Sequence, residues 1–137
     1  MADALRALAT MNHRFAPQFA KTMLATPRAD DDAAAFAAHC KAMNFEFTEG
    51  WADQNIPFVS PLLRDFAAKR GSIRYMEIGA YEGRNLAFMD WLLPAKLDVT
   101  VIDPWFDEDL NPEEKYHAVA PRFARNTAKL SFSRLTT

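Results

Sequence analysis

Cysteine is nearly absent from this chain, whose 137 residues include only Cys40. A single cysteine excludes a disulfide framework within one chain and favours a reducing compartment. We therefore expect a cytoplasmic protein. Cys40 also falls on an apolar helical stripe, where a buried packing role is commoner than a nucleophilic one.

The sequence also lacks a basic excess and any long apolar run. Sixteen Lys and Arg stand against 18 Asp and Glu, for a formal charge of −2. This balance leaves no excess of positive charge that would bind the phosphate backbone of a nucleic acid. No apolar segment approaches the roughly 18 residues that a membrane span requires. We expect neither nucleic acid nor a membrane as a partner.

The composition that remains is globular, with 50% hydrophobic and 25% charged residues, which suits one packed domain. The pattern changes near residue 71, from alanine-rich helical texture to alternating strand-like and helix-like segments. We predict a helical N-terminal region over 1–70 and a partial second region over 71–137. The basic composition of residues 1–29 is shared by transit peptides and amphipathic helices, and we favour the helix.

Helical spacing of apolar residues predicts three helices in the first region. They span 3–24, 30 to about 44, and 59–69, with a loop over 45–57. The acidic triplet 30–32 suits a helix N-cap and first turn. A metal site is disfavoured there, because three adjacent carboxylates point in different directions. Gly71 is predicted to end the third helix.

The second region alternates strand, helix, strand and helix, over 73–78, 85–93, 97–102 and 111 to about 130. This order favours a parallel sheet with right-handed crossovers. About two strand–helix units fit after residue 73, and the polar segment 131–137 is not typical of a buried strand. We therefore expect the incomplete N-terminal half of a Rossmann-like α/β sheet, preceded by an α-helical leader.

The turn after the first predicted strand carries the chemical motif, in the sequence EIGAYEGR from Glu77 to Arg84. Gly79 lets the backbone turn sharply and lets a ligand approach, while Gly83 allows close packing of helix and strand. Free N–H groups of the following helix can bind a polar group. Asp103, at the end of the second strand, can accept hydrogen bonds from the two hydroxyls of a ribose. Together these features predict a nucleoside cofactor at the carboxyl edge of the sheet.

Two residues of the turn decide between cofactors. A dinucleotide fingerprint needs glycine two positions after Gly79, where Tyr81 stands and would crowd a pyrophosphate. Glu77 would repel a pyrophosphate but suits a cationic amino group. S-adenosylmethionine carries an ammonium, a sulfonium and a ribose without phosphate, so we favour it over NAD.

The motif resembles class I S-adenosylmethionine-dependent methyltransferases, in the small-molecule branch whose first motif reads EIGxxEGR. The resemblance covers roughly 45–130, including the Ile102–Asp103 step, the lead-in over 47–57, and Arg122, Phe123 and Asn126. It implies that Glu77 and Gly79 line the methionine part of the cofactor and that Asp103 holds the ribose. It also implies that Pro104 and Trp105 lie near the adenine. Trp105 reads equally well as a core aromatic. The expected cofactor-binding residues are Glu77, Gly79, Ala80, Tyr81, Gly83, Asp103, Pro104 and Trp105.

The resemblance implies methyl transfer to a small-molecule acceptor. No catalytic residue can be assigned, and the three histidines share no metal-ligand spacing. We expect the substrate pocket, any base and any metal ligands beyond the segments present. Glu82 could contact the cofactor or favour the helix N-terminus, and Arg84 could pair with Glu82 or Glu77 or face solvent.

Two other functions stay open. A half-sheet exposes an edge strand and an apolar face, so the chain could be a non-catalytic binding or assembly module, including a homo-oligomer that completes its sheet between chains. The other is a nucleotide-binding oxidoreductase, against which Tyr81 and Glu77 count.

Overall fold

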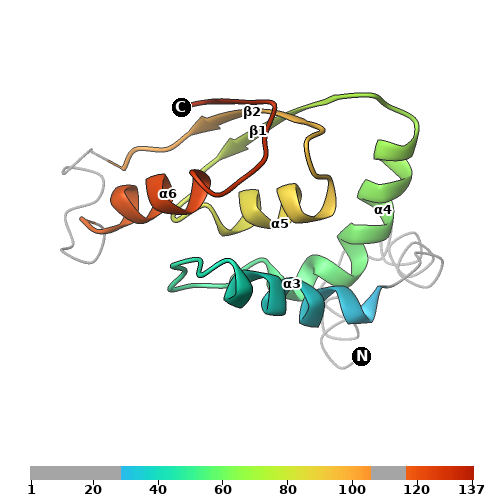
Figure 1. Ribbon diagram of the computed structural model, residues 1–137, viewed down its shortest axis with the longest axis horizontal. Coiled ribbons are helices and arrows are strands. Elements are labelled where there is room, and N and C mark those ends of the chain that lie inside the picture. The colour runs from blue at the N-terminus through green and yellow to red at the C-terminus, as the bar shows by residue number, and fades with distance from the viewer. Residues whose placement is uncertain (1–28, 106–116) are drawn as a thin grey trace, which may run out of the picture.

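The computed structural model describes residues 29–105 and 117–137, and Figure 1 gives the labels used below. The helices are α3 (Asp30–Ala42), the 3-10 turn η1 (Asp53–Asn55), α4 (Ile56–Ala68), α5 (Arg84–Leu92) and α6 (Val119–Thr127). The strands are β1 (Ile73–Ile78), β2 (Leu97–Ile102) and β3 (Arg134–Thr136). The helix predicted over 3–24 and the helix start predicted at residue 111 lie outside the described residues.

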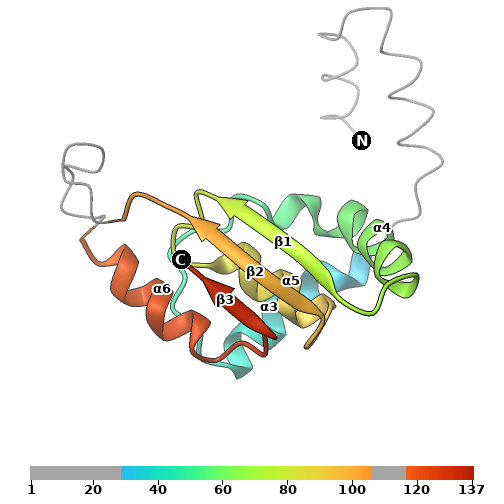
Figure 2. The same ribbon diagram turned by 90° about the horizontal axis from the view of Figure 1, so that it is seen from above.

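The three strands form one parallel sheet in the order β1-β2-β3 (Figure 2). The predicted bounds of β1 and β2 are confirmed, and their register runs from Ile73 opposite Leu97 to Ile78 opposite Ile102. Helices α5 and α6 both lie on one side of this sheet (Figure 1), as right-handed crossovers between successive neighbours require. The fold is therefore mixed α/β.

Strand β3 corrects the expectation that the sheet ends after the second strand–helix unit, although 131–137 does not form a buried strand. It pairs with β2, and Arg134 Nε donates to Asp98 Oδ1 across the pair at 2.8 Å. Leu135 packs against the core, while Arg134 and Thr136 are exposed. The segment looks too polar for a strand because only one of its three side chains faces the helices.

The helix bounds differ from prediction at their ends. Helix α4 begins at Ile56 rather than 59, and Pro57 lies in its first turn, where the missing N–H of proline costs no hydrogen bond. Its C-cap is Lys69, so Gly71 does not end it. The acidic triplet does lie in the first turn of α3, but the N-cap is Ala29, without a side-chain cap.

Helix α6 is shorter than the predicted helix that ends near 130. His117 and Ala118 form a turn, and the helix covers Val119–Thr127. Asn126 then accepts the Lys129 N–H and Thr127 the Leu130 N–H through their carbonyls, so the chain leaves α6 through tight turns toward β3.

The layers share one hydrophobic core, which includes residues from both predicted regions. Leu86 of α5 and Leu97 and Val99 of β2 are fully buried, and Phe36 of α3 joins the same cluster at 1% exposure. Cys40 is buried in it as well, which confirms its predicted place in the core, and burial raises the pKa of its thiol. In Figure 1 the sheet lies at the top, α5 and α6 lie below it, and α3 lies below α5 and α6.

The sheet face opposite the helices is open. Met76 and Ile78 of β1 and Ile102 of β2 are 61%, 72% and 54% exposed, and Figure 2 looks onto this face. None of the helices within 29–105 and 117–137 is long and apolar enough to cross a membrane.

Candidate functional site

The turn from β1 to α5 depends on two glycines with left-handed backbone, at φ 79° for Gly79 and 81° for Gly83. A Cβ on Gly83 would lie 3.2 Å from Cδ2 of Phe123 in α6, so this glycine permits close packing. A Cβ on Gly79 would meet no atom within 4 Å. Gly79 therefore borders open space, where a ligand can approach the backbone.

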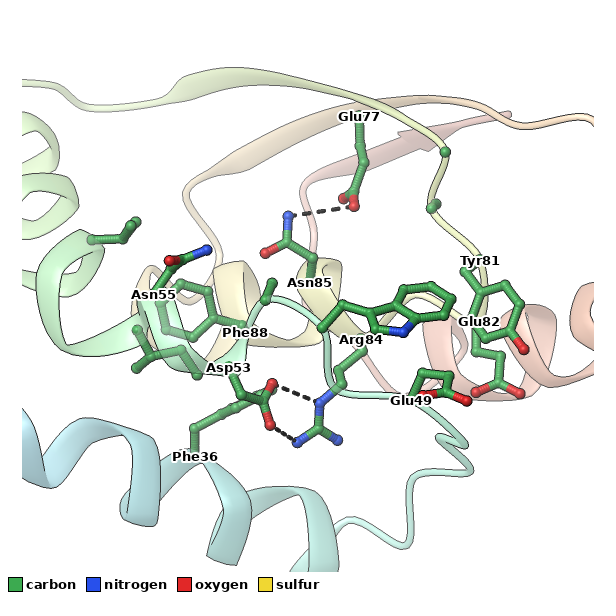
Figure 3. A pocket seen from close by; sticks show the side chains of 16 residues that line it. Phe36, Glu49, Asp53, Asn55, Glu77, Tyr81, Glu82, Arg84, Asn85 and Phe88 are labelled. Atoms are coloured by element: carbon green, nitrogen blue, oxygen red, sulfur yellow. Dashed lines mark hydrogen bonds and ion pairs between the residues drawn. The ribbon is translucent and has the colours of Figure 1, made fainter. Parts of the chain in front are cut away.

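Two adjoining cavities flank this turn. The first cavity, of about 290 Å³, lies between the turn and helices α3, α4 and α5 (Figure 3). The second cavity, of about 230 Å³, lies at the end of β2. Trp51, Gly79 and Tyr81 line both, so the two hollows meet at these three residues.

Seven of the eight expected cofactor residues line these cavities. Glu77, Gly79, Ala80 and Tyr81 line the first, and Gly79, Tyr81, Asp103, Pro104 and Trp105 line the second. Gly83 is not among the lining residues, because it packs against α6.

The residues that follow β2 hold the turn that follows β1. Asp103 Oδ2 accepts the Tyr81 N–H at 3.0 Å, and Trp105 Nε1 donates to the Tyr81 carbonyl at 2.9 Å. Trp105 also packs on Phe123 with ring centroids 4.2 Å apart. Trp105 is thus both a packing aromatic and a cavity wall.

Glu77 is a half-buried carboxylate held by neutral donors. Tyr75 Oη donates to Oε2 at 3.1 Å and Asn85 Nδ2 to Oε1 at 3.3 Å (Figure 3 shows the Asn85 bond). Burial, with a smaller contribution from the charge of Asp103, raises the pKa of Glu77 above its ordinary value. Burial likewise raises the pKa of the Tyr75 phenol. A cationic ligand group beside Glu77 would offset the cost of its buried charge.

Glu82 lines the first cavity and also makes a buried ion pair that neither expectation included. Its side chain is 1% exposed and accepts the Thr48 N–H at 2.6 Å and Arg122 NH1 at 2.8 Å. Asn126 of α6 donates to the Glu82 carbonyl at 2.9 Å and to the Glu46 carbonyl at 3.1 Å. Glu82 therefore ties the loop after α3 to the turn and to α6. The i, i+4 spacing of Arg122 and Asn126 was the sequence signal for this shared helix face.

Arg84 pairs with Asp53, so all three expectations for it were wrong. Its Nε and NH2 donate to the two Asp53 carboxylate oxygens at 2.8 and 2.5 Å (Figure 3). The partners are 31 positions apart in sequence, and Asp53 raises the pKa of the guanidinium. Within the described ranges, no three His, Cys, Asp or Glu gather in a group that could hold a metal ion.

No protein-family model, curated protein or solved structure matches the chain. The family resemblance therefore rests on the motif residues themselves.

Glu77→Gln is expected to stabilise the protein at pH 7. A carboxyl whose folded pKa lies above its ordinary 4.5 binds more protons in the folded than in the unfolded state. Stability thus falls as pH rises from 4.5 through the folded pKa, and the ionised group costs free energy at every higher pH. Urea unfolding at pH 7 and pH 4 should show a variant advantage that shrinks at pH 4.

Glu46→Gln supplies the control of opposite sign. The Arg125 guanidinium lowers the pKa of Glu46, so this variant should lose stability at pH 7 and converge on the native protein as pH falls. An advantage of Glu77→Gln that is the same at both pH values would contradict the assignment of a raised Glu77 pKa.

Proposed function

We propose that the chain binds S-adenosylmethionine at the carboxyl edge of a Rossmann-like sheet and serves methyl transfer to a small-molecule acceptor in the cytoplasm. One observation carries the proposal. Asp103, after β2, accepts the backbone N–H of Tyr81, after β1, and two cavities meet at Tyr81. Asp103 and the glycine turn, which the motif pairs in sequence, thus line two cavities that share Trp51, Gly79 and Tyr81.

The chemistry of the two cavities suits this cofactor. The second cavity offers the Asp103 carboxylate for a ribose diol and Pro104 and Trp105 as flat walls for a base. The first offers Glu77 for an ammonium. Among the described lining residues the sole cation is Arg84, which Asp53 neutralises. A pyrophosphate would therefore meet carboxylates without a free cation, which supports S-adenosylmethionine over NAD.

The sulfonium of the bound cofactor supplies a methyl group that is already activated. What the chain has to do is hold the reactants in line and limit access of water. Glu77 would orient the amino group, Asp103 the ribose, and the Trp51–Tyr81 pair, with ring centroids 5.0 Å apart, would cover the junction of the two cavities.

Calorimetric titration with S-adenosylhomocysteine tests the proposal. The native chain should bind saturably, and Asp103→Ala should weaken binding by roughly ten- to a hundredfold, since a hydrogen bond to a charged group contributes about 1.5 to 3 kcal/mol. Asp103→Asn removes the charge but keeps an acceptor for the Tyr81 N–H. It therefore distinguishes the effect of the charge on binding from the effect of a disturbed turn. Asp98→Ala, on the same strand and paired with the exposed Arg134, is the matched control.

Two outcomes would refute the cofactor site: no binding by a folded native chain, or equal binding by the Asp103 and Asp98 variants. A binding or assembly module is then the second candidate. The exposed side chains of Met76, Ile78 and Ile102 favour it, because exposed apolar patches mark association surfaces. A folded chain that does not bind S-adenosylhomocysteine, and that elutes from a size-exclusion column as a homo-oligomer, would support this second candidate.

A further inference from the structure

We propose that the first cavity, where it lies against α3 and α4, binds an apolar amine. This inference rests on the proposed function, in which the amine is the methyl acceptor. Transfer would join the acceptor's nucleophilic atom to the methyl carbon and break the carbon–sulfur bond. The bound ammonium first releases a proton to water, and the lone pair this frees on nitrogen forms the bond to the methyl carbon. The electron pair of the broken carbon–sulfur bond goes to sulfur.

The deep wall of the first cavity is apolar and comes largely from the helical region. Phe36 of α3, Ile56 and Val59 of α4, and Phe88 of α5 line it, and three of them are less than 5% exposed. The substrate pocket was expected beyond the segments present, whereas this cavity lies within them. Its volume of about 290 Å³ is at the lower end for small-molecule sites and suits a ligand of one or two rings.

The charges around this wall are acidic once internal ion pairs are set aside. Asp53 is neutralised by Arg84 and Glu82 by Arg122. Glu77 is held by the neutral donors Tyr75 and Asn85, and Glu49 also lines the cavity. In the proposed function Glu77 holds the amino group of the cofactor, so Glu49 is the lining carboxylate left for the ammonium of an acceptor. An anionic ligand would be repelled here.

Aromatic faces at the mouth of the cavity give a second, independent reason for a cation. Trp51 is 66% exposed although it is a large aromatic residue, and it lies beside Tyr81 where the two cavities meet. A cation over the face of Trp or Tyr gains about 0.5 to 2 kcal/mol. Figure 3 shows Tyr81 and Glu49 on one side of the cavity and Phe36, Phe88 and Asn55 on the other.

Two probes with one ring system and opposite charge test this inference. The full chain is titrated calorimetrically with tryptamine, a cation, and with indole-3-propionate, an anion. Tryptamine should bind saturably and at least tenfold more tightly than indole-3-propionate. Val59→Trp should fill the cavity and weaken tryptamine binding at least tenfold, whereas Leu62→Trp, at an exposed site on the same helix, should leave it unchanged.

Equal affinity for both probes would overturn the charge argument, and unchanged tryptamine binding by Val59→Trp would overturn the location. If Val59→Trp does not fold, Glu49→Gln serves instead and should reduce the preference for tryptamine. Titration of the same variants with S-adenosylhomocysteine keeps the two proposals apart. Tryptamine binding without S-adenosylhomocysteine binding would refute the methyltransferase proposal alone, and the reverse would refute the amine site alone.

Discussion

Replacing Arg122 with methionine is expected to lower the free energy of unfolding by about 3 to 5 kcal/mol. Methionine keeps an unbranched apolar stem but removes the charge, so Glu82 would remain as a carboxylate at 1% exposure without its cation. Its other partners are the neutral N–H and hydroxyl of Thr48. Removing one partner of a buried ion pair is costly because the remaining charge has lost its solvent and its counterion.

A double-mutant cycle separates the pair from the packing around it. Glu82→Gln combined with Arg122→Met should be more stable than Arg122→Met alone, because no buried charge is then left uncompensated. Arg122→Lys keeps the charge and should lose less. Urea denaturation measures the native protein, Arg122→Met, Glu82→Gln, the double variant and Arg122→Lys. A loss below 1 kcal/mol for Arg122→Met would mean that water reaches Glu82 and that the tie between loop and helix is not electrostatic.

The effect should extend to the cavities, because Glu82 fixes the segment that carries Trp51. Thr48 binds the Glu82 carboxylate through both its N–H and its hydroxyl, and Trp51 follows three positions later. Variants that weaken the bonds of Glu82 to Thr48 and Arg122 should therefore also lower ligand affinity in the first cavity. Both motif acids, Glu77 and Glu82, line the first cavity, but Glu82 is also bound to Thr48 and Arg122.

Local patterns predicted the strands and the turn, because the forces that form them act over short stretches of chain. The β-prone residues between Gly71 and Gly79 predicted both ends of β1. The alternation of apolar and polar residues from Leu97 predicted both ends of β2. Strand β3 escaped prediction because its single inward side chain, Leu135, gives no periodic signal. Its pairing with β2 depends on tertiary contacts such as the Arg134–Asp98 ion pair.

The candidate site also combines residues that local patterns predict with residues that only tertiary packing brings together. The residues at the carboxyl ends of β1 and β2, such as Glu77 and Asp103, follow from motif spacing and parallel topology. The cavity wall from Phe36 and Val59 and the Arg84–Asp53 pair depend on how α3 packs against α4 and α5. No spacing rule connects side chains across a 31-residue separation, so these partners became visible only in three dimensions.

Alanine at the two glycines of the turn should separate stability from binding. Both positions have φ near 80°, a conformation that costs a residue with a Cβ about 1 to 2 kcal/mol. Gly83→Ala additionally forces a methyl group to 3.2 Å from the Phe123 ring, which already packs on Trp105. Overpacking of this kind costs about 1 to 3 kcal/mol, so Gly83→Ala should lose about 2 to 5 kcal/mol of unfolding free energy.

Gly79→Ala should lose only the backbone term of about 1 to 2 kcal/mol, because its Cβ meets no atom within 4 Å. That methyl group would instead stand where the two cavities meet, so it should weaken S-adenosylhomocysteine binding more than Gly83→Ala does. Urea denaturation and calorimetric titration of both variants measure the two effects side by side. If Gly79→Ala proves the less stable of the two, or binds as tightly as the native chain, then Gly79 serves the fold of the turn rather than the approach of a ligand.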